Sequence, residues 1–383
     1  MGKLKSVTIG AAAIFTAILS CSDTIAGQAV RGTAYLAAGV TYEEPSESTE
    51  SVDSSSTASS AESTSSTTST SSVETTRSDV STASQPEEPP KAVGKIITLN
   101  RSTDTDDTDY SEFTTHTGEI SRYAFGKSTA TNYVTLDGGA QVQNLTDVTC
   151  ETLAEAAKSL PPLGKVENPA ELPQVLIYHT HTTESYFPHV DWYDEDCPDR
   201  SRDCSRNMTA VGDAICNALS ERGIASVHDC TVHDYPMYTG AYYRSADTVE
   251  AVLAKYPSIK LVLDIHRDGI AASDGTPIAP AVTVNGKSAA QFMIISGCDD
   301  KNELDLPNYM ENFKTACLVQ RAAEAAYPGL ARAVLFDYRN YNQHISPGSL
   351  LIEVGSQANT LDEAVYTGEL IGNILADSIL ELQ

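Results

Sequence analysis

From residue 173 to the end of the chain, short apolar runs alternate with longer segments whose apolar residues recur at helical spacing. Uninterrupted apolar runs are typical of strands buried on both faces, as in parallel sheets. Their alternation with helices predicts an α/β fold, with a mostly parallel sheet and helices on both faces. We expect strands at residues 175–178, 224–228, 261–265, 292–295, 334–336 and 350–354, and helices at 208–219, 249–256, 309–327 and from Thr360 onward.

Local signals mark two of these helix ends. Gly223 follows the first helix and suits the left-handed conformation in which many helices stop. Thr360 stands three residues before Glu363, which is the spacing of a capping box. The last helix is therefore expected to begin directly after Thr360.

The first 27 residues indicate the compartment. Lys3 and Lys5 precede an uncharged, mostly apolar run over 6–22, which is the pattern of a secretory or anchoring segment. Cys21 follows a loose lipoprotein cleavage box, so lipidation there is an alternative. We favour an uncleaved anchor over lipidation, and both over free secretion. The expected location is extracytoplasmic, attached to the cell membrane.

The segments that follow differ in composition. Residues 28–95 are expected to be a disordered linker, because from residue 41 they are Ser, Thr and Glu with almost no large apolar side chain. As a flexible coil this linker would reach roughly 40 Å. Residues 96–169 are expected to form a small accessory subdomain, with a strand and turn at 133–139 and a helix at 149–160. Residues 170–383, which carry the alternating strands and helices, are expected to form the main domain.

Charge and cysteine content narrow the possibilities further. A net charge of -27 argues against nucleic acid as a partner and against electrostatic binding to anionic lipid. Cys197 and Cys204 share a polar loop and are the best candidates for a disulfide outside the cytoplasm. Cys216 and Cys317 lie on apolar helical faces and are expected to be buried as small hydrophobic residues.

The segment richest in ligand chemistry is HTHTTE, residues 179–184, directly after the expected strand 175–178. Ligand sites in open α/β sheets form at the carboxyl ends of strands. His181 and Glu184 have the His-x-x-Glu spacing, and zinc hydrolases commonly use two His and one Glu. His179 is a second possibility, either in place of His181 or as a substrate contact or support behind the ligands, because a continued strand would put both histidines on one side.

A third ligand must come from another segment. His266 ends the strand 261–265 and is the best candidate, while His228 and His233 near another strand end compete with it. The remaining histidines, His116, His189 and His344, lie in polar loops.

Glu353 is the expected proton acceptor. It lies within the apolar run 350–354, where a carboxylate is costly unless it is paired or near a cation. Zinc lowers the pKa of its water to about 7, and a nearby carboxylate can take the proton and pass it to a leaving amine. The alternative is an edge-strand carboxylate that faces solvent. A serine triad is not indicated, because the chain lacks a G-x-S-x-G elbow.

Three blocks of the chain resemble the stage II sporulation protein P family. They are LIYHTHTTESY at 176–186, LDIHRDG at 263–269 and NQHISPGSLLIEVGSQANT at 342–360, in the family order. The resemblance covers roughly residues 170–383. It implies a zinc amidase-like domain that acts as an N-acetylmuramoyl-L-alanine amidase on peptidoglycan, with additional endopeptidase activity. It also implies a lytic transglycosylase partner during engulfment of the forespore.

Carried over by residue, the resemblance implies His181, Glu184 and His266 as zinc ligands and Glu353 as the base. Arg267, Asn342 and Asn359 lie in the matched blocks and are candidate substrate contacts. The long acidic linker leaves ordinary wall remodelling open beside sporulation. Two other functions also stay open: a zinc carboxypeptidase-type enzyme that acts on stem peptides, and a non-catalytic surface module.

Overall fold

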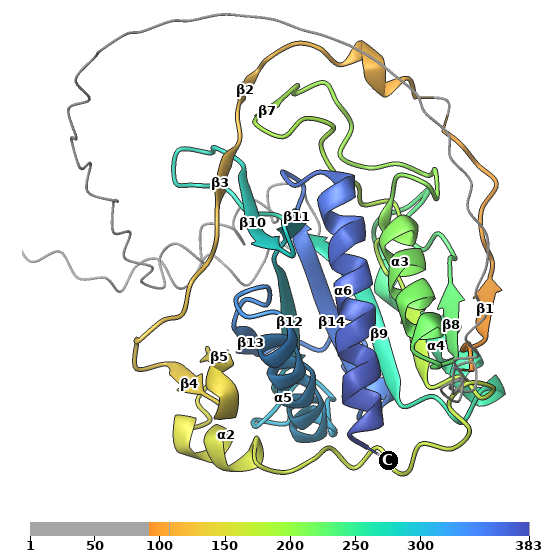
Figure 1. The fold of residues 1–383 in the computed structure, drawn as a ribbon, viewed down its shortest axis with the longest axis vertical. Helices are drawn as coiled ribbons and strands as arrows, with labels where there is room; N and C mark the ends of the chain where they lie inside the picture. Colours follow the sequence, from red (N-terminus) through yellow and green to blue (C-terminus); the bar gives the residue numbers. More distant parts are fainter. Residues whose placement is uncertain (1–91, 107, 383) are drawn as a thin grey trace, which may run out of the picture. The chain divides into compact units, whose positions relative to one another are not determined.

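The computed structural model describes residues 92–106 and 108–382, and a nine-stranded sheet lies at their centre (Figure 1). Its strands follow the order β1-β8-β6-β9-β14-β12-β13-β5-β4. All neighbours are parallel except β12 with β14 and β4 with β5. The strands are β1 (Ile96–Leu99), β4 (Tyr133–Thr135), β5 (Gln141–Asn144), β6 (Val175–Tyr178), β8 (Ser226–Asp229), β9 (Leu261–Asp268), β12 (Phe292–Gly297), β13 (Val334–Asp337) and β14 (Ser349–Ser356).

Helices cover both faces of this sheet. The side chains of Val175 and Ile177 pack into one apolar core, while those of Leu176 and Tyr178 pack into another, as the alternation along a strand requires. Figure 1 shows α3, α6 and α5 side by side over one face, and α4 contributes to the core on the other. The helices are α2 (Cys150–Ala156), α3 (Met208–Glu221), α4 (Ala241–Lys255), α5 (Tyr309–Ala326) and α6 (Leu361–Leu380). The expected α/β class is therefore confirmed.

Two small sheets and three short helical turns complete the described chain. Strand β10 (Ile278–Val284) pairs with β11 (Lys287–Ala290) and with β3 (Ser121–Tyr123), and β2 (Gly118–Glu119) pairs with β7 (Trp192–Tyr193). The turns are η1 (Tyr110–Glu112), η2 (Asp137–Gly139) and η3 (Gln343–Ile345). Within the described residues, no helix is both long and apolar enough to cross a membrane.

The sequence signals for helix ends hold. Thr360 caps α6 through its side chain, and the Glu363 side chain accepts a hydrogen bond from the backbone of Thr360, which completes the capping box. Gly223 adopts a φ of 76° one residue after the cap of α3. Both predictions rested on local backbone geometry, and the local sequence sufficed for them.

The region over 96–169 supplies strands at both edges of the main sheet, with β1 at one edge and β5 and β4 at the other. The division of the chain at residue 169 stays a prediction. The expected anchor over 1–27, with Cys21, and the linker up to residue 91 lie outside the described residues.

The candidate pair of Cys197 and Cys204 does not form a disulfide. Cys197 and Cys204 are both buried and free. The thiol of Cys204 lies 3.6 Å from the carbonyl of Ser102, while the Cys197 amide closes a turn on Asp194, so the two residues have different surroundings. Cys216 and Cys317 are buried in the apolar core, as their helical positions predicted.

Close contact between α3 and α6 depends on Gly372. A Cβ atom added there would lie 2.5 Å from the carbonyl oxygen of Ile215 and 2.6 Å from Cβ of Ala218. We expect Gly372→Ala to lower the unfolding free energy by about 1–2 kcal/mol, because overpacking outweighs the gain in helix propensity. Urea unfolding measures the change. Gly126→Ala is the control, since nothing lies within 4 Å of its added Cβ, and an equal loss there would contradict the packing explanation.

Candidate metal centre

The HTHTTE turn leaves the carboxyl end of β6 and is held by two buried carboxylates. Asp264 accepts hydrogen bonds from the amide of Thr180 at 2.8 Å and from its hydroxyl at 2.7 Å. Asp234 accepts from the hydroxyl of Thr183 at 2.6 Å and from its amide at 3.2 Å. The two threonines thus fix the path of the turn, and with it the positions of His181 and Glu184.

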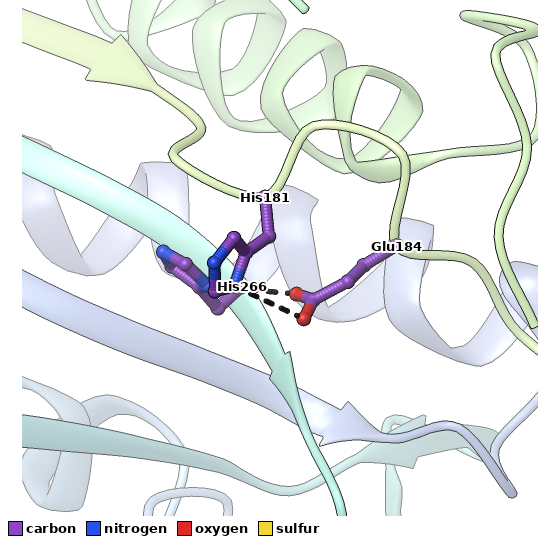
Figure 2. A group of neighbouring side chains, drawn as sticks. All are labelled: His181, Glu184 and His266. Atoms are coloured by element: carbon purple, nitrogen blue, oxygen red, sulfur yellow. Dashed lines mark ion pairs between the residues drawn. The ribbon is translucent and has the colours of Figure 1, made fainter. Parts of the chain in front are cut away.

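Three candidate ligands converge beside this turn. Figure 2 shows the carboxylate of Glu184 facing the rings of His181 and His266. Its Oε1 lies 3.4 Å from Nδ1 of His181, and its Oε2 lies 3.5 Å from Nδ1 of His266. One ligand atom from each residue lies within 4.8 Å of the others, and all three residues are buried. Two imidazole nitrogens and one carboxylate are a donor set that fits zinc and leaves a position open.

The electrostatics of this trio reflect how closely its members lie. Burial alone would raise the pKa of Glu184, but the imidazoles of His181 and His266 hold that pKa well below its usual range. Burial alone would lower the pKa of His266, but the carboxylates of Asp264 and Glu184 raise it well above its ordinary value. The carboxylates of Asp264 and Glu184 thus favour a positive charge at His266, which is the charge that a bound dication would supply.

Asp264 also contacts the trio directly. Its Oδ1 forms an ion pair at 2.9 Å with Nε2 of His266, the ring nitrogen that does not face Glu184. A carboxylate behind a ligating imidazole fixes the ring orientation and raises the basicity of the ligand. Asp264 therefore joins the two segments that carry the candidate ligands.

Glu353 lies on the strand next to His266. The two residues are register partners in the parallel pair of β14 and β9, and β14 is flanked on its other side by β12, so Glu353 is not on an edge strand. Its Oε2 is out of contact with solvent and has no hydrogen-bond partner among the described residues. Burial, followed by the charge of Asp268, raises the pKa of Glu353 to about 8.

The other strand-end histidines lie outside the trio. His179 Nδ1 is 3.0 Å from the carbonyl of Ile265, and its Nε2 is 3.0 Å from Nε2 of His228, whose Nδ1 lies 3.0 Å from Asp213. Burial and the neighbouring His228 lower the pKa of His179 to about 3. His233 Nδ1 lies 2.7 Å from the carbonyl of His179. These histidines support the turn from behind, whereas His181 faces Glu184.

Comparison with known proteins decides the family. The family model described as Stage II sporulation protein P matches residues 22–376. This chain belongs to the stage II sporulation protein P family. The curated Stage II sporulation protein P of Bacillus subtilis (strain 168) is 31% identical over 214 residues, which are 53% of this chain and 50% of that protein. The chain thus spans about half the length of that curated relative.

Solved amidase structures show weaker similarity. An N-acetylmuramoyl-L-alanine amidase from Clostridium difficile 630 is 17% identical, with 56% of this chain and 95% of that chain covered and a TM-score of 0.31. The CwlD amidase of Clostridioides difficile, solved in complex with the GerS lipoprotein, is 12% identical, with coverage of 54% and 94% and a TM-score of 0.32. TM-scores this low establish neither a shared fold nor a shared function.

Arg267 and Asn359, two of the candidate substrate contacts, form hydrogen bonds within the protein. The guanidinium of Arg267 donates to the carbonyl of Ser185 at 2.8 Å and to Asp199 at 2.7 Å, so its side chain supports the loop after the turn, while its amide lies 3.3 Å from Oε2 of Glu184. Asn359 donates to the carbonyl of Pro280 and to Glu363.

Asn342 and the loop histidines complete the set. Asn342 donates to Ser245 Oγ at 3.0 Å, and that hydroxyl lies 2.7 Å from the hydroxyl of Thr180 in the HTHTTE turn. His344 pairs with Asn340. The remaining loop histidines, His116 and His189, both stack on Trp192.

Three further residues contact the trio, and the sequence alone does not point to them. The sequence pattern places Asp264 only within a buried strand. Arg200 lies 3.5 Å from Oε1 of Glu184, and Tyr238 stacks on His181 with ring centroids 4.5 Å apart. The only signal for Asp264 was a carboxylate within an apolar run. Arg200 and Tyr238 stand in polar loops whose residues carry no periodic pattern.

The raised pKa of Glu353 has a consequence for stability. An unfolded Glu loses its proton near pH 4.3, whereas folded Glu353 keeps it to about pH 8, so rising pH destabilises the metal-free fold across this interval. We therefore expect the unfolding free energy of Glu353→Gln, relative to that of the parent, to rise by more than about 1 kcal/mol as the pH increases from 4.5 to 8. Thermal unfolding with a chelator measures the difference. A gain that does not change with pH would contradict the assignment.

Proposed function

We propose that this chain is a zinc-dependent peptidoglycan hydrolase, an N-acetylmuramoyl-L-alanine amidase with additional endopeptidase activity, that acts in sporulation. Family membership supports the substrate class and the biological setting. The observation that carries the chemistry is Glu353, which is the register partner of His266 beside a buried His, Glu and His trio and whose Oε2 has no hydrogen-bond partner in the described part of the chain. Acid-base and metal-binding groups therefore meet at one place.

The residues divide the chemical work. His181, Glu184 and His266 would hold zinc, which when bound polarises a carbonyl and makes water a better nucleophile. Glu353 would take a proton from the attacking water at its unpartnered Oε2 and deliver it to the nitrogen of L-alanine as the lactyl amide breaks. The added positive charge of a dication favours the ionised form of Glu353, so binding of the metal prepares the base.

Location and partners belong to the same proposal. The basic and apolar start of the chain would keep the hydrolase attached to the outer face of the cell membrane, where peptidoglycan lies. A lytic transglycosylase would be its partner, since it cuts the glycan strands from which an amidase removes the peptides. The acidic net charge keeps nucleic acid out of the set of expected partners.

Glu353→Gln tests the proposed reaction. We expect this variant of the full chain to lose cleavage of purified sacculi by about 10²- to 10⁴-fold, because the proton acceptor is removed while the metal ligands remain. Zinc content is measured on the same samples and is expected to equal that of the parent. Turnover close to that of the parent would end the assignment of Glu353.

The products decide which bond is cut. Mass spectrometry of digested sacculi should find free stem peptides, such as tetrapeptide, and intact glycan if the lactyl amide is hydrolysed. Shortened stems still attached to the glycan would instead assign the chain to the zinc peptidases. Absence of metal from the purified protein together with absence of both products would leave a non-catalytic module.

Asp264→Asn tests the support behind His266. The amide keeps the shape of the side chain but loses the charge that faces Nε2 of the imidazole. We expect zinc affinity to fall about 10- to 100-fold, as measured by competition with a chromophoric chelator. Asp299→Asn is the control, because Asp299 caps backbone amides of the 303–306 turn and does not contact the trio. Equal affinities for Asp264→Asn and the parent would contradict this role.

A further inference from the structure

Three exposed apolar side chains stand within four consecutive positions of the loop between β8 and α4. Tyr235 is 53% exposed, Met237 64% and Tyr238 38%. Within the described residues, no other stretch of four holds three exposed large apolar side chains. We name these three residues the Tyr-Met platform. Exposed apolar clusters of this kind mark binding surfaces more often than single exposed residues do.

The backbone that carries the platform is fixed. Asp234 binds the hydroxyl of Thr183 at 2.6 Å, and Nδ1 of His233 lies 2.7 Å from the carbonyl of His179. The guanidinium of Arg244 donates to three carbonyls of the loop, those of His233, Met237 and Thr239. Because polar contacts of the backbone and of neighbouring residues hold the loop, the platform is preorganised for a ligand.

The platform begins at a candidate metal ligand. The ring of Tyr238 stacks on His181, with centroids 4.5 Å apart and planes at 26°. Tyr242, on the first turn of α4, meets the same imidazole edge-on at 5.6 Å. The amide that is cut joins a sugar-linked group to a peptide. When the scissile carbonyl lies at the metal site, one of these two groups therefore extends over the platform.

The charges around the platform favour the sugar over the peptide. Arg200 lies 5.0 Å over the ring of Tyr238, and Arg202 lies 4.7 Å over that of Tyr235. Both guanidinium groups are already paired with carboxylates, Arg200 with Asp234 at 2.8 Å and Arg202 with Asp104. The exposed parts of these side chains thus offer apolar surface without spare positive charge, whereas a stem peptide with several carboxylates would need cations.

The size of the platform argues against a protein partner. A specific protein interface buries about 800 Å² on each side and draws on roughly 20–30 residues. Three partly exposed side chains in one loop supply a small part of that area. They match one or two pyranose rings, whose apolar C–H faces pack on aromatic faces.

We propose that the Tyr-Met platform binds the glycan strand of peptidoglycan at the sugar that carries the hydrolysed amide. This inference rests on the proposed function and names the part of the substrate that gives specificity. The enzyme would then recognise the sugar chain beside the metal and not the stem peptide alone.

The test uses full-length protein and glycan strands stripped of all peptides. We expect the double variant Tyr235→Ala/Met237→Ala, whose residues do not contact the trio, to raise the dissociation constant about tenfold, which is about 1.4 kcal/mol of binding free energy. Tyr235→Phe with Met237 unchanged keeps both apolar surfaces and should bind as the parent does. Leu172→Ala is the control, because Leu172 is similarly exposed and lies three residues before the start of β6. Isothermal titration calorimetry measures each affinity, and zinc content confirms that the site is intact.

Three results would overturn the proposal. The first is equal glycan affinity for parent and double variant. The second is a double variant that binds isolated stem peptide more weakly than the parent but binds glycan equally well. The third is a dimer of the parent in sedimentation that the double variant does not form. Because stripped strands contain no scissile amide, their binding is independent of hydrolysis. Platform-dependent glycan binding without hydrolysis of sacculi would contradict only the proposed reaction. Hydrolysis of sacculi without platform-dependent glycan binding would contradict only this inference.

Discussion

The carboxylate of Asp264 connects the two chain segments on which the candidate centre depends. It is fully buried on β9, and it accepts two hydrogen bonds from Thr180 while its Oδ1 lies 2.9 Å from the ring of His266. A buried carboxylate is costly unless such partners are present. The interaction therefore requires the HTHTTE turn and strand β9 to stay together, and this fixes the distance between His181, Glu184 and His266.

The order of the strands in the main sheet brings Glu353 beside the trio. Strands β6, β9 and β14 are parallel neighbours, so their carboxyl ends lie at one edge of the sheet. The turn, His266 and Glu353 come from these three strands. The apolar cores on both sides of the sheet hold the strands rigidly, and a rigid scaffold lets a site keep partly unpaired groups such as Oε2 of Glu353.

The sequence predicted the sheet and the trio because their signals are local. Apolar runs mark buried strands, and Thr360 with Glu363 marks a helix start, without knowledge of any distant contact. His181 and His179 were not separable by spacing. The structure separates them because β6 ends at Tyr178, so the alternation of a strand no longer applies beyond it. Cys197 and Cys204 do not form a disulfide, because two cysteines that are close along a loop can still have their thiols in different surroundings.

Other features depend on partners far away in the sequence. Asp264 has its role through Thr180, and Tyr238 through His181, contacts that no periodic pattern encodes. The strands at 96–99 and 141–144 join the main sheet at opposite edges, which short polar-flanked segments could not reveal. Tertiary contacts, not propensities, decide these cases.

We propose above that the buried His, Glu and His trio holds zinc. Elemental analysis of the full chain, purified without chelator, tests it most directly. We expect about one zinc per chain, retained in His344→Ala and lost in His181→Ala and in His266→Ala. A parent protein without zinc, or trio variants that keep it, would contradict the assignment of the trio as a zinc site.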